Sequence, residues 1–146
     1  MIKRAIPILL IALVFSLSAT ADEEQAGLKY WNGIDKEAIT TSSGLQYKIM
    51  VNGNGRKPEE KNRVAVHYRG LLLDGTEFDS SYSSDEPITL SLKRVIKGWT
   101  EGIQLMPTGS VFIFLIPPEL AYGRKGAETI PPDSTLIFVV ELFGVK

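Results

Sequence analysis

Alternating apolar and polar residues predict β-strands along most of the chain after residue 44. The alternation runs through residues 45–51, 63–73 and 87–92, and two further, strongly apolar strands are predicted at 110–116 and 135–145. In the segment 63–73, Tyr68 and His67 fall on opposite faces, because successive side chains of a strand point apart. Asp74-Gly75 predicts a hairpin whose two central residues both take positive φ, with the chain returning through 76–79. Since 87–92 alternates again after a polar loop, we expect one edge strand interrupted by an excursion.

A single short helix is predicted between residues 97 and 106, where Trp99, Ile103 and Met106 recur at helical spacing. Two glycines inside the segment weaken the helix, and Pro107 ends it after about two turns. Strands on both sides of one helix indicate an α+β fold. We expect an antiparallel sheet of about five strands wrapped around one short helix.

The first 21 residues have the composition of a secretory signal peptide. Two cations precede an apolar run, and small residues end the segment at Ala19-Thr20-Ala21. An uncleaved anchor helix is the alternative, but the apolar run is shorter than the ~20 residues of a membrane span, and no cysteine is present to carry a lipid. We therefore expect a signal peptide (1–21), a flexible leader (22–41) and one domain (42–146), exported to the periplasm or secreted, with no stable membrane anchor.

The composition excludes several functional classes. Lysine and arginine number 16 against 17 aspartates and glutamates, with no basic stripe, so nucleic acid is not an expected partner. The chain has no cysteine and one histidine, which excludes the usual zinc spacings, and no calcium loop motif occurs. We expect no metal and no cofactor. A hydrolase built on His67 is disfavoured because no GxSxG motif is present.

Aromatic residues in five separate motifs are the best candidates for a site. Tyr68, Phe78, Trp99, Tyr122 and Phe138 are far apart in the sequence and can meet only if the fold brings them together. Without a nucleophile nearby, such a cluster would act through shape and low polarity, as a pocket for an apolar peptide. The alternative is that these rings are core residues, since large aromatics mostly serve burial.

Four motifs together resemble the FKBP-type peptidyl-prolyl cis-trans isomerases: VHYRGLLLDGTEFDSSY, PITLSLKRVIKGWTEGIQLM, IPPELAYG and IPPDSTLIFVVEL. The lead-in SSGLQYK and the signal peptide are similar to the exported, macrophage-infectivity-potentiator-like bacterial branch. The resemblance extends from Ser42 to Lys146. It implies an isomerase that acts on unfolded or proline-containing polypeptides and binds macrolide inhibitors.

The same resemblance implies the site residues. Asp79 and Tyr122 would be the polar groups near the substrate carbonyls, and Trp99 would form the floor of the proline pocket. The full pocket lining it implies is Tyr68, Phe78, Val95, Ile96, Trp99, Ile130 and Phe138. The expected mechanism is desolvation and orientation of the peptide bond, with no covalent intermediate and no proton transfer.

Some positions depart from the family pattern. Ser84, or its neighbours, stands where many relatives have an arginine able to pair with the pocket aspartate. Ile88 replaces a frequent phenylalanine, and Ala127 a frequent histidine. These departures leave a second interpretation open, in which the chain is a proline-peptide-binding chaperone or docking module with little turnover.

One further pattern concerns the outer face of the sheet. The strands predicted at 110–116 and 135–145 are apolar on both faces, whereas a sheet with one wet face normally alternates with polar residues. We expect this outer face to be covered, either by Tyr30 and Trp31 of the leader or by a second copy in a homodimer. The alternative is a tolerated apolar surface, since exposed aliphatic residues are common. The outer residues are Val111, Ile113, Leu115, Ile137 and Val139.

Overall fold

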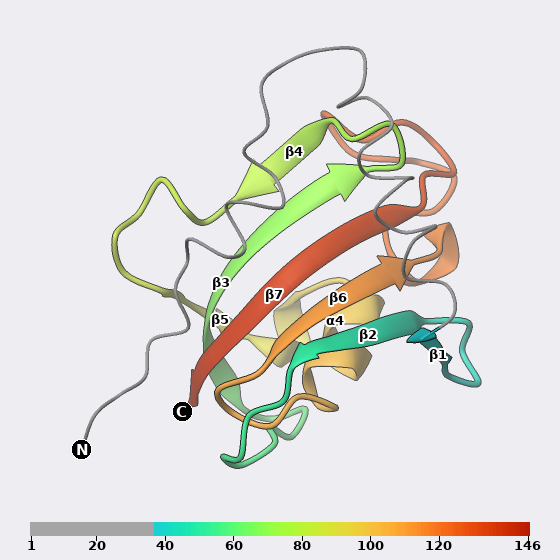
Figure 1. The fold of residues 1–146 in the computed structure, drawn as a ribbon. Coiled ribbons are helices and arrows are strands. Elements are labelled where there is room, and N and C mark those ends of the chain that lie inside the picture. Colours follow the sequence, from blue (N-terminus) through green and yellow to red (C-terminus); the bar gives the residue numbers. More distant parts are fainter. Residues whose placement is uncertain (1–36) are drawn as a thin grey trace.

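A strongly curved antiparallel sheet dominates the computed structural model, which describes residues 37–146 (Figure 1). The predicted signal peptide and most of the predicted leader lie outside the described residues. The elements follow the order β1 (Ile39–Thr40), β2 (Gln46–Val51), β3 (Arg63–Leu72), β4 (Glu77–Ser80), β5 (Ile88–Ser91), η2 (Leu92–Arg94), α4 (Lys97–Ile103), β6 (Val111–Ile116), η3 (Pro118–Leu120) and β7 (Leu136–Val145).

The strands lie in the order β1-β2-β6-β7-β3-β4, and every pairing between strands is antiparallel. β5 also pairs with β3, next to β4 and on the edge opposite β7. The predicted interrupted edge strand is therefore confirmed. Counted with β4 and β5 as one edge, the sheet has the five predicted strands and, in addition, the two-residue strand β1.

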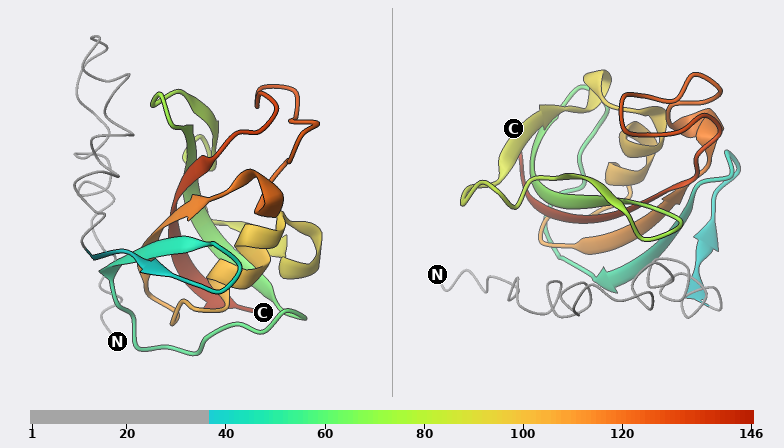
Figure 2. Two further views of the ribbon diagram at one scale, coloured as in Figure 1. Left: turned by 90° about the vertical axis from the view of Figure 1, so that its right-hand side faces the viewer. Right: turned by 90° about the horizontal axis from the view of Figure 1, so that it is seen from above.

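The helix α4 lies inside the curve of the sheet, as the view from above shows (Figure 2). Its Trp99 and Ile103, together with Met106 just beyond it, are buried in the main core. The inward side chains of β6 and β7 meet them there, including Phe112 and Phe114. The α+β prediction of a sheet around one short helix is thus confirmed.

Two glycines determine how closely α4 approaches β6. A Cβ at Gly98 would lie 2.5 Å from Cγ2 of Ile116, and a Cβ at Gly102 would lie 2.6 Å from Cε1 of Phe114. Real Cβ atoms do not approach other atoms so closely. Glycine weakens a helix by about 1 kcal/mol relative to alanine, but here it allows the helix backbone to pack directly on the strand.

The predicted hairpin forms, but its turn differs from the prediction. Gly75 has φ +91°, whereas Asp133 is the one non-glycine residue with positive φ in residues 37–146, so Asp74 does not share this conformation. The Gly75 amide donates to Leu72 O, and the Asp74 carboxylate accepts the Thr76 amide at 2.8 Å. The pairing of β3 with β4 shifts by one residue beside this hairpin, because Gly70 pairs with Asp79 but Leu71 pairs with Glu77. A three-residue loop ending in glycine therefore replaces the expected two-residue turn.

The sheet begins earlier than the predicted boundary between leader and domain. Ile39 and Thr40 of β1 pair with β2, although the leader was predicted to extend to residue 41. The hydroxyl of Thr41 donates to Glu101 on α4 at 2.8 Å, which fixes this segment against the helix. No helix within residues 37–146 is long and apolar enough to cross a membrane.

The outer face of the sheet is buried, as the apolar pattern predicted. Ile113 and Ile137 are fully buried, Val111 and Val139 are almost so, and Leu115 is partly exposed. Among the described residues, Ala38, Val51 and Leu73 pack against this cluster. Tyr30 and Trp31, the leader residues predicted to cover it, lie outside the described residues.

Alanine at Gly98 tests the close contact between helix and strand. We expect Gly98→Ala to lower the free energy of unfolding by about 1 kcal/mol, because overpacking costs roughly 1–3 kcal/mol and outweighs the gain in helix propensity. Urea denaturation measures the change. Gly144→Ala is the matched control, since nothing lies within 4 Å of its added Cβ. A Gly98→Ala variant as stable as the parent would show that the packing is not tight.

Candidate active site

A cleft of about 400 Å³ opens between the concave face of the sheet and α4. Aromatic and aliphatic side chains make up most of its wall, together with one carboxylate and one guanidinium. Its lining residues are Tyr68, Asp79, Leu90, Arg94, Val95, Ile96, Trp99, Tyr122 and Phe138.

Three aromatic rings form the inner part of this cleft. Tyr68 meets Trp99 edge to face at a centroid distance of 4.8 Å, and Trp99 meets Phe138 in the same way at 5.2 Å. Trp99 is 4 % exposed, and its Nε1 has no hydrogen-bond partner within the described residues. Perpendicular rings fix one another's orientation. The cleft therefore presents a rigid, apolar inner surface.

Gly70 makes room for the aromatic packing behind the cleft. A Cβ there would lie 2.7 Å from both Phe138 Cε1 and Phe78 Cζ. Phe78 therefore packs edge-on against Phe138, with centroids 5.5 Å apart, and joins the main core without lining the cleft. Ile130 also belongs to this core and is 5 % exposed. Of the predicted pocket residues, Tyr68, Val95, Ile96, Trp99 and Phe138 line the cleft. Phe78, which is partly exposed, and the buried Ile130 belong to the hydrophobic cluster next to it.

Leu90 and Arg94 line the cleft but were missed by sequence reasoning. The sequence did indicate an inward position for Leu90, because it lies two residues after Ile88 on the predicted strand and therefore on the same face. Arg94 carried no such signal. It ends the short helix η2, whose side chains follow no strand periodicity.

Asp79 is held by a neighbouring side chain and by the backbone. The Tyr68 hydroxyl donates to Asp79 Oδ2 at 2.7 Å, and the Ser80 amide donates to Oδ1 at 2.9 Å. Burial, followed by the hydrogen bond to Asp79, raises the pKa of Tyr68 well above its usual value, so the phenol stays a donor. Asp79 itself is exposed. The pair gives the cleft a fixed negative charge at its edge.

Ser84 does not take the place of the arginine found in many relatives. Its hydroxyl donates to the backbone oxygen of Glu86 at 3.0 Å, and its amide to Ser81 O. Asp79 has no ion pair within residues 37–146. Tyr68 is therefore the side chain that orients this carboxylate.

Tyr122 also lines the cleft, two residues after the end of η3. Its side chain is 40 % exposed, and its hydroxyl makes no hydrogen bond within residues 37–146. Gly123, with φ +58°, donates back to Pro118 O and so turns the chain directly after it. The hydroxyl is left available to a bound chain.

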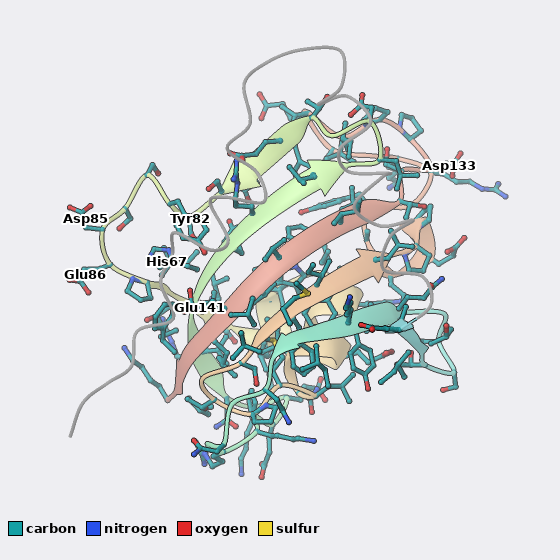
Figure 3. All side chains as sticks on the ribbon, in the orientation of Figure 1. His67, Tyr82, Asp85, Glu86, Asp133 and Glu141 are labelled. Atoms are coloured by element: carbon teal, nitrogen blue, oxygen red, sulfur yellow. The ribbon has the colours of Figure 1, made fainter. Side chains whose placement is uncertain are left out.

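A second polar cluster lies on the outer face of the sheet, where Figure 3 shows His67, Tyr82 and Glu141 close together. His67 stacks on Tyr82 at 4.7 Å, and its Nδ1 lies 2.9 Å from Ser81 Oγ. The Ser81 hydroxyl also accepts the Tyr68 amide at 2.7 Å and is buried. This serine links β3 to the loop that follows β4.

The buried carboxyl of Glu141 makes the stability of the folded protein depend on pH. Burial raises its pKa to about 7 from the usual 4.5, and its Oε2 has no partner among the described residues. Between these two pKa values, the Glu141 carboxyl is ionised in the unfolded chain but protonated in the folded chain. Stability is therefore fully present below about pH 4.5 and falls as the pH rises through about 7.

We expect the free energy of unfolding to fall by at most about 1.4 kcal/mol per pH unit across this window. Glu141→Gln should remove the decline and stabilise the protein at pH 8, as thermal unfolding between pH 4.5 and pH 8 would measure. The exposed Glu128→Gln is the control and should keep the decline. An unchanged pH profile in Glu141→Gln would contradict the assignment.

The fold and cleft place the protein in a known family. The model of the FKBP-type peptidyl-prolyl cis-trans isomerases matches residues 54–143, and the chain belongs to this family. It is similar to the FKBP-type peptidyl-prolyl cis-trans isomerase FkpA of Aeromonas hydrophila, with 52% identity over 112 residues, covering 76% of this chain and 42% of the relative. The peptidyl-prolyl cis-trans isomerase Mip of Coxiella burnetii is 42% identical over 128 residues, covering 87% and 51%.

Solved structures show the same fold. The crystal structure of FkpA from Escherichia coli has a TM-score of 0.75 at 45% identity, covering 86% of this chain and 60% of that one. A peptidyl-prolyl cis-trans isomerase from Pseudomonas syringae has a TM-score of 0.72 at 34% identity, covering 89% and 98%. The chain spans about half the length of the curated relatives it matches.

Proposed function

We propose that the chain is an active peptidyl-prolyl cis-trans isomerase that accelerates rotation about peptide bonds preceding proline in exported proteins. The observation that carries this proposal is the aromatic cleft, which is also lined by the Tyr68–Asp79 pair and by Tyr122, whose hydroxyl makes no hydrogen bond within residues 37–146. A proline ring is apolar and fits such a wall, whereas the two polar groups face the peptide backbone.

The chemistry requires no nucleophile. Resonance in the amide bond sets a barrier of ~18–20 kcal/mol, and water stabilises the planar, charge-separated form. A cleft walled by Trp99 and Phe138 withholds that water and so favours the twisted state. Each ~1.4 kcal/mol of preference for the twisted state is tenfold in rate.

The polar groups have separate roles in this proposal. Tyr122 donates a hydrogen bond to a substrate carbonyl next to the rotating bond and fixes its orientation. Asp79, held by Tyr68, presents a negative charge to the carbonyl dipole as it turns. Neither residue transfers a proton.

The second candidate function is a binding module that keeps the pocket but has little turnover. It is favoured because, within residues 37–146, Asp79 has no arginine partner and Ser84 bonds to the backbone of its own loop. The presence of Tyr68 as an alternative partner for the carboxylate favours the enzyme.

A protease-coupled assay on a proline peptide separates the two functions. We expect turnover that a macrolide pocket ligand inhibits, and we expect Asp79→Ala to lower kcat/KM at least about tenfold, the loss of ~1.4 kcal/mol of transition-state stabilisation. Asp85→Ala, which removes an exposed acid outside the cleft, is the control and should retain activity. Macrolide binding without turnover would select the binding module, and full activity in Asp79→Ala would remove Asp79 from the mechanism.

The predicted signal peptide and the family membership also support a location and partners for the protein. The apparent signal peptide supports export, to the periplasm or the medium, where the substrates would be unfolded or proline-containing polypeptides. Membership of the family supports binding of macrolide inhibitors.

We further propose that the outer face is covered by the leader of the same chain and not by a second copy. The support is the apolar character of the outer residues Val111, Ile113, Ile137 and Val139, and the burial of these side chains within a single chain. Tyr30 and Trp31 are the best candidates for the cover.

A truncation tests this cover. We expect residues 22–146 to sediment as a monomer, and removal of 22–36 to lower Tm by at least about 4 °C, equivalent to ~1 kcal/mol. The shortened chain should also self-associate through its exposed apolar face. A dimer of the longer chain would instead favour the second copy, whereas a shortened chain that is monomeric and equally stable would exclude both covers.

A further inference from the structure

Arg94 is a charged residue of the cleft to which no role has been assigned. It ends η2, directly before the lining residues Val95 and Ile96, and it is exposed. Within residues 37–146 it makes no hydrogen bond or ion pair. A cation that lines a binding cleft and has no partner among the described residues is available to a ligand.

The surroundings of Arg94 strengthen its positive field. Lys93 and Lys97 are also exposed, on either side of it in the sequence. The one acid of this segment, Glu101, is engaged by the hydroxyls of Thr41 and Ser43. The rim formed by η2 and the start of α4 is therefore positive.

The cleft also holds a negative charge. Asp79 of β4 lines it, and the Tyr68 hydroxyl keeps this carboxylate in place. A free anion would gain from Arg94 but would be repelled by Asp79 in the same cleft. A peptide avoids this repulsion, because its proline occupies the apolar wall while a flanking side chain reaches Arg94.

We propose that Arg94 selects substrates with an acidic side chain adjacent to the target proline. This inference rests on the proposed isomerase function and specifies its substrates. The guanidinium presents a planar fork of donors that matches a carboxylate, whereas it repels a basic side chain at the same place. Because the pair is solvent-exposed, it contributes selectivity of a few-fold and weakens with salt.

The test uses two series of proline peptides, with Glu, Gln or Lys either before or after the proline. Rates are measured by NMR exchange, which needs no coupling protease. At low salt, we expect kcat/KM in at least one series to be about 1.5- to 5-fold higher for Glu than for Gln, and lower for Lys. The preference should fade near 1 M salt, where the Debye length is about 3 Å.

A pair of charge reversals separates local from long-range effects. In Arg94→Glu the order of the three peptides should reverse. Lys93→Glu makes the same change in net charge at a neighbouring residue that does not line the cleft, and it should keep the parental order. Equal rates for all three peptides in both series, or equal shifts in both variants, would overturn the proposal.

The Gln peptides keep this test distinct from that of the isomerase function. Their turnover by the parent protein reports the activity alone, with no charged side chain beside the proline. If they bind without turnover, the affinities of the same peptides, measured by calorimetry, report the selectivity of Arg94 with the same expected order.

Discussion

The packing of α4 against β6 is the contact on which the rest of the structure depends. A helix this short gains little stability from its own hydrogen bonds, so its place is fixed by burial inside the curved sheet. Gly98 and Gly102 bring its backbone onto Ile116 and Phe114, and this contact sets the depth at which Trp99 meets Tyr68 and Phe138. The volume of the cleft is therefore set by backbone packing that lies outside the cleft itself.

The polar parts of the site are organised differently from its apolar wall. The wall is held by rings that orient one another, whereas Asp79 depends on a single side-chain donor, Tyr68. Tyr68 belongs to both systems, because its ring is part of the wall and its hydroxyl holds the carboxylate. Substitutions at Tyr68 thus change shape and charge together, and they are harder to interpret than substitutions at Asp79 or Arg94.

Periodicity was sufficient to predict the fold, because each strand has one face on the core and a period of two. Inward and outward residues of β6 and β7 were assigned correctly, as the core of Phe112 and Leu142 and the outer cluster of Ile113 and Ile137 show. The predicted type of the hairpin turn was wrong. Asp-Gly fits more than one turn, and the three-residue loop occurs here together with the bulge beside Gly70.

The lining of the site was less predictable. Phe78 contacts the lining residue Phe138 without lining the cleft itself, and periodicity does not distinguish these two positions. Arg94 reaches the cleft because the curved sheet carries η2 next to α4, and no local pattern indicates that placement.

The loop between β4 and β5 leaves the edge of β3 and returns to the same edge. At its start, the Ser81 hydroxyl accepts a hydrogen bond from the backbone of β3. Its exposed tip, residues 83–86, carries Asp85 and Glu86 away from the sheet (Figure 3). Because both ends are fixed on one strand, its length can change without altering the register of any pairing. The fold thus contains a natural insertion point, at which a recognition segment or a whole domain could be added while the cleft keeps its geometry.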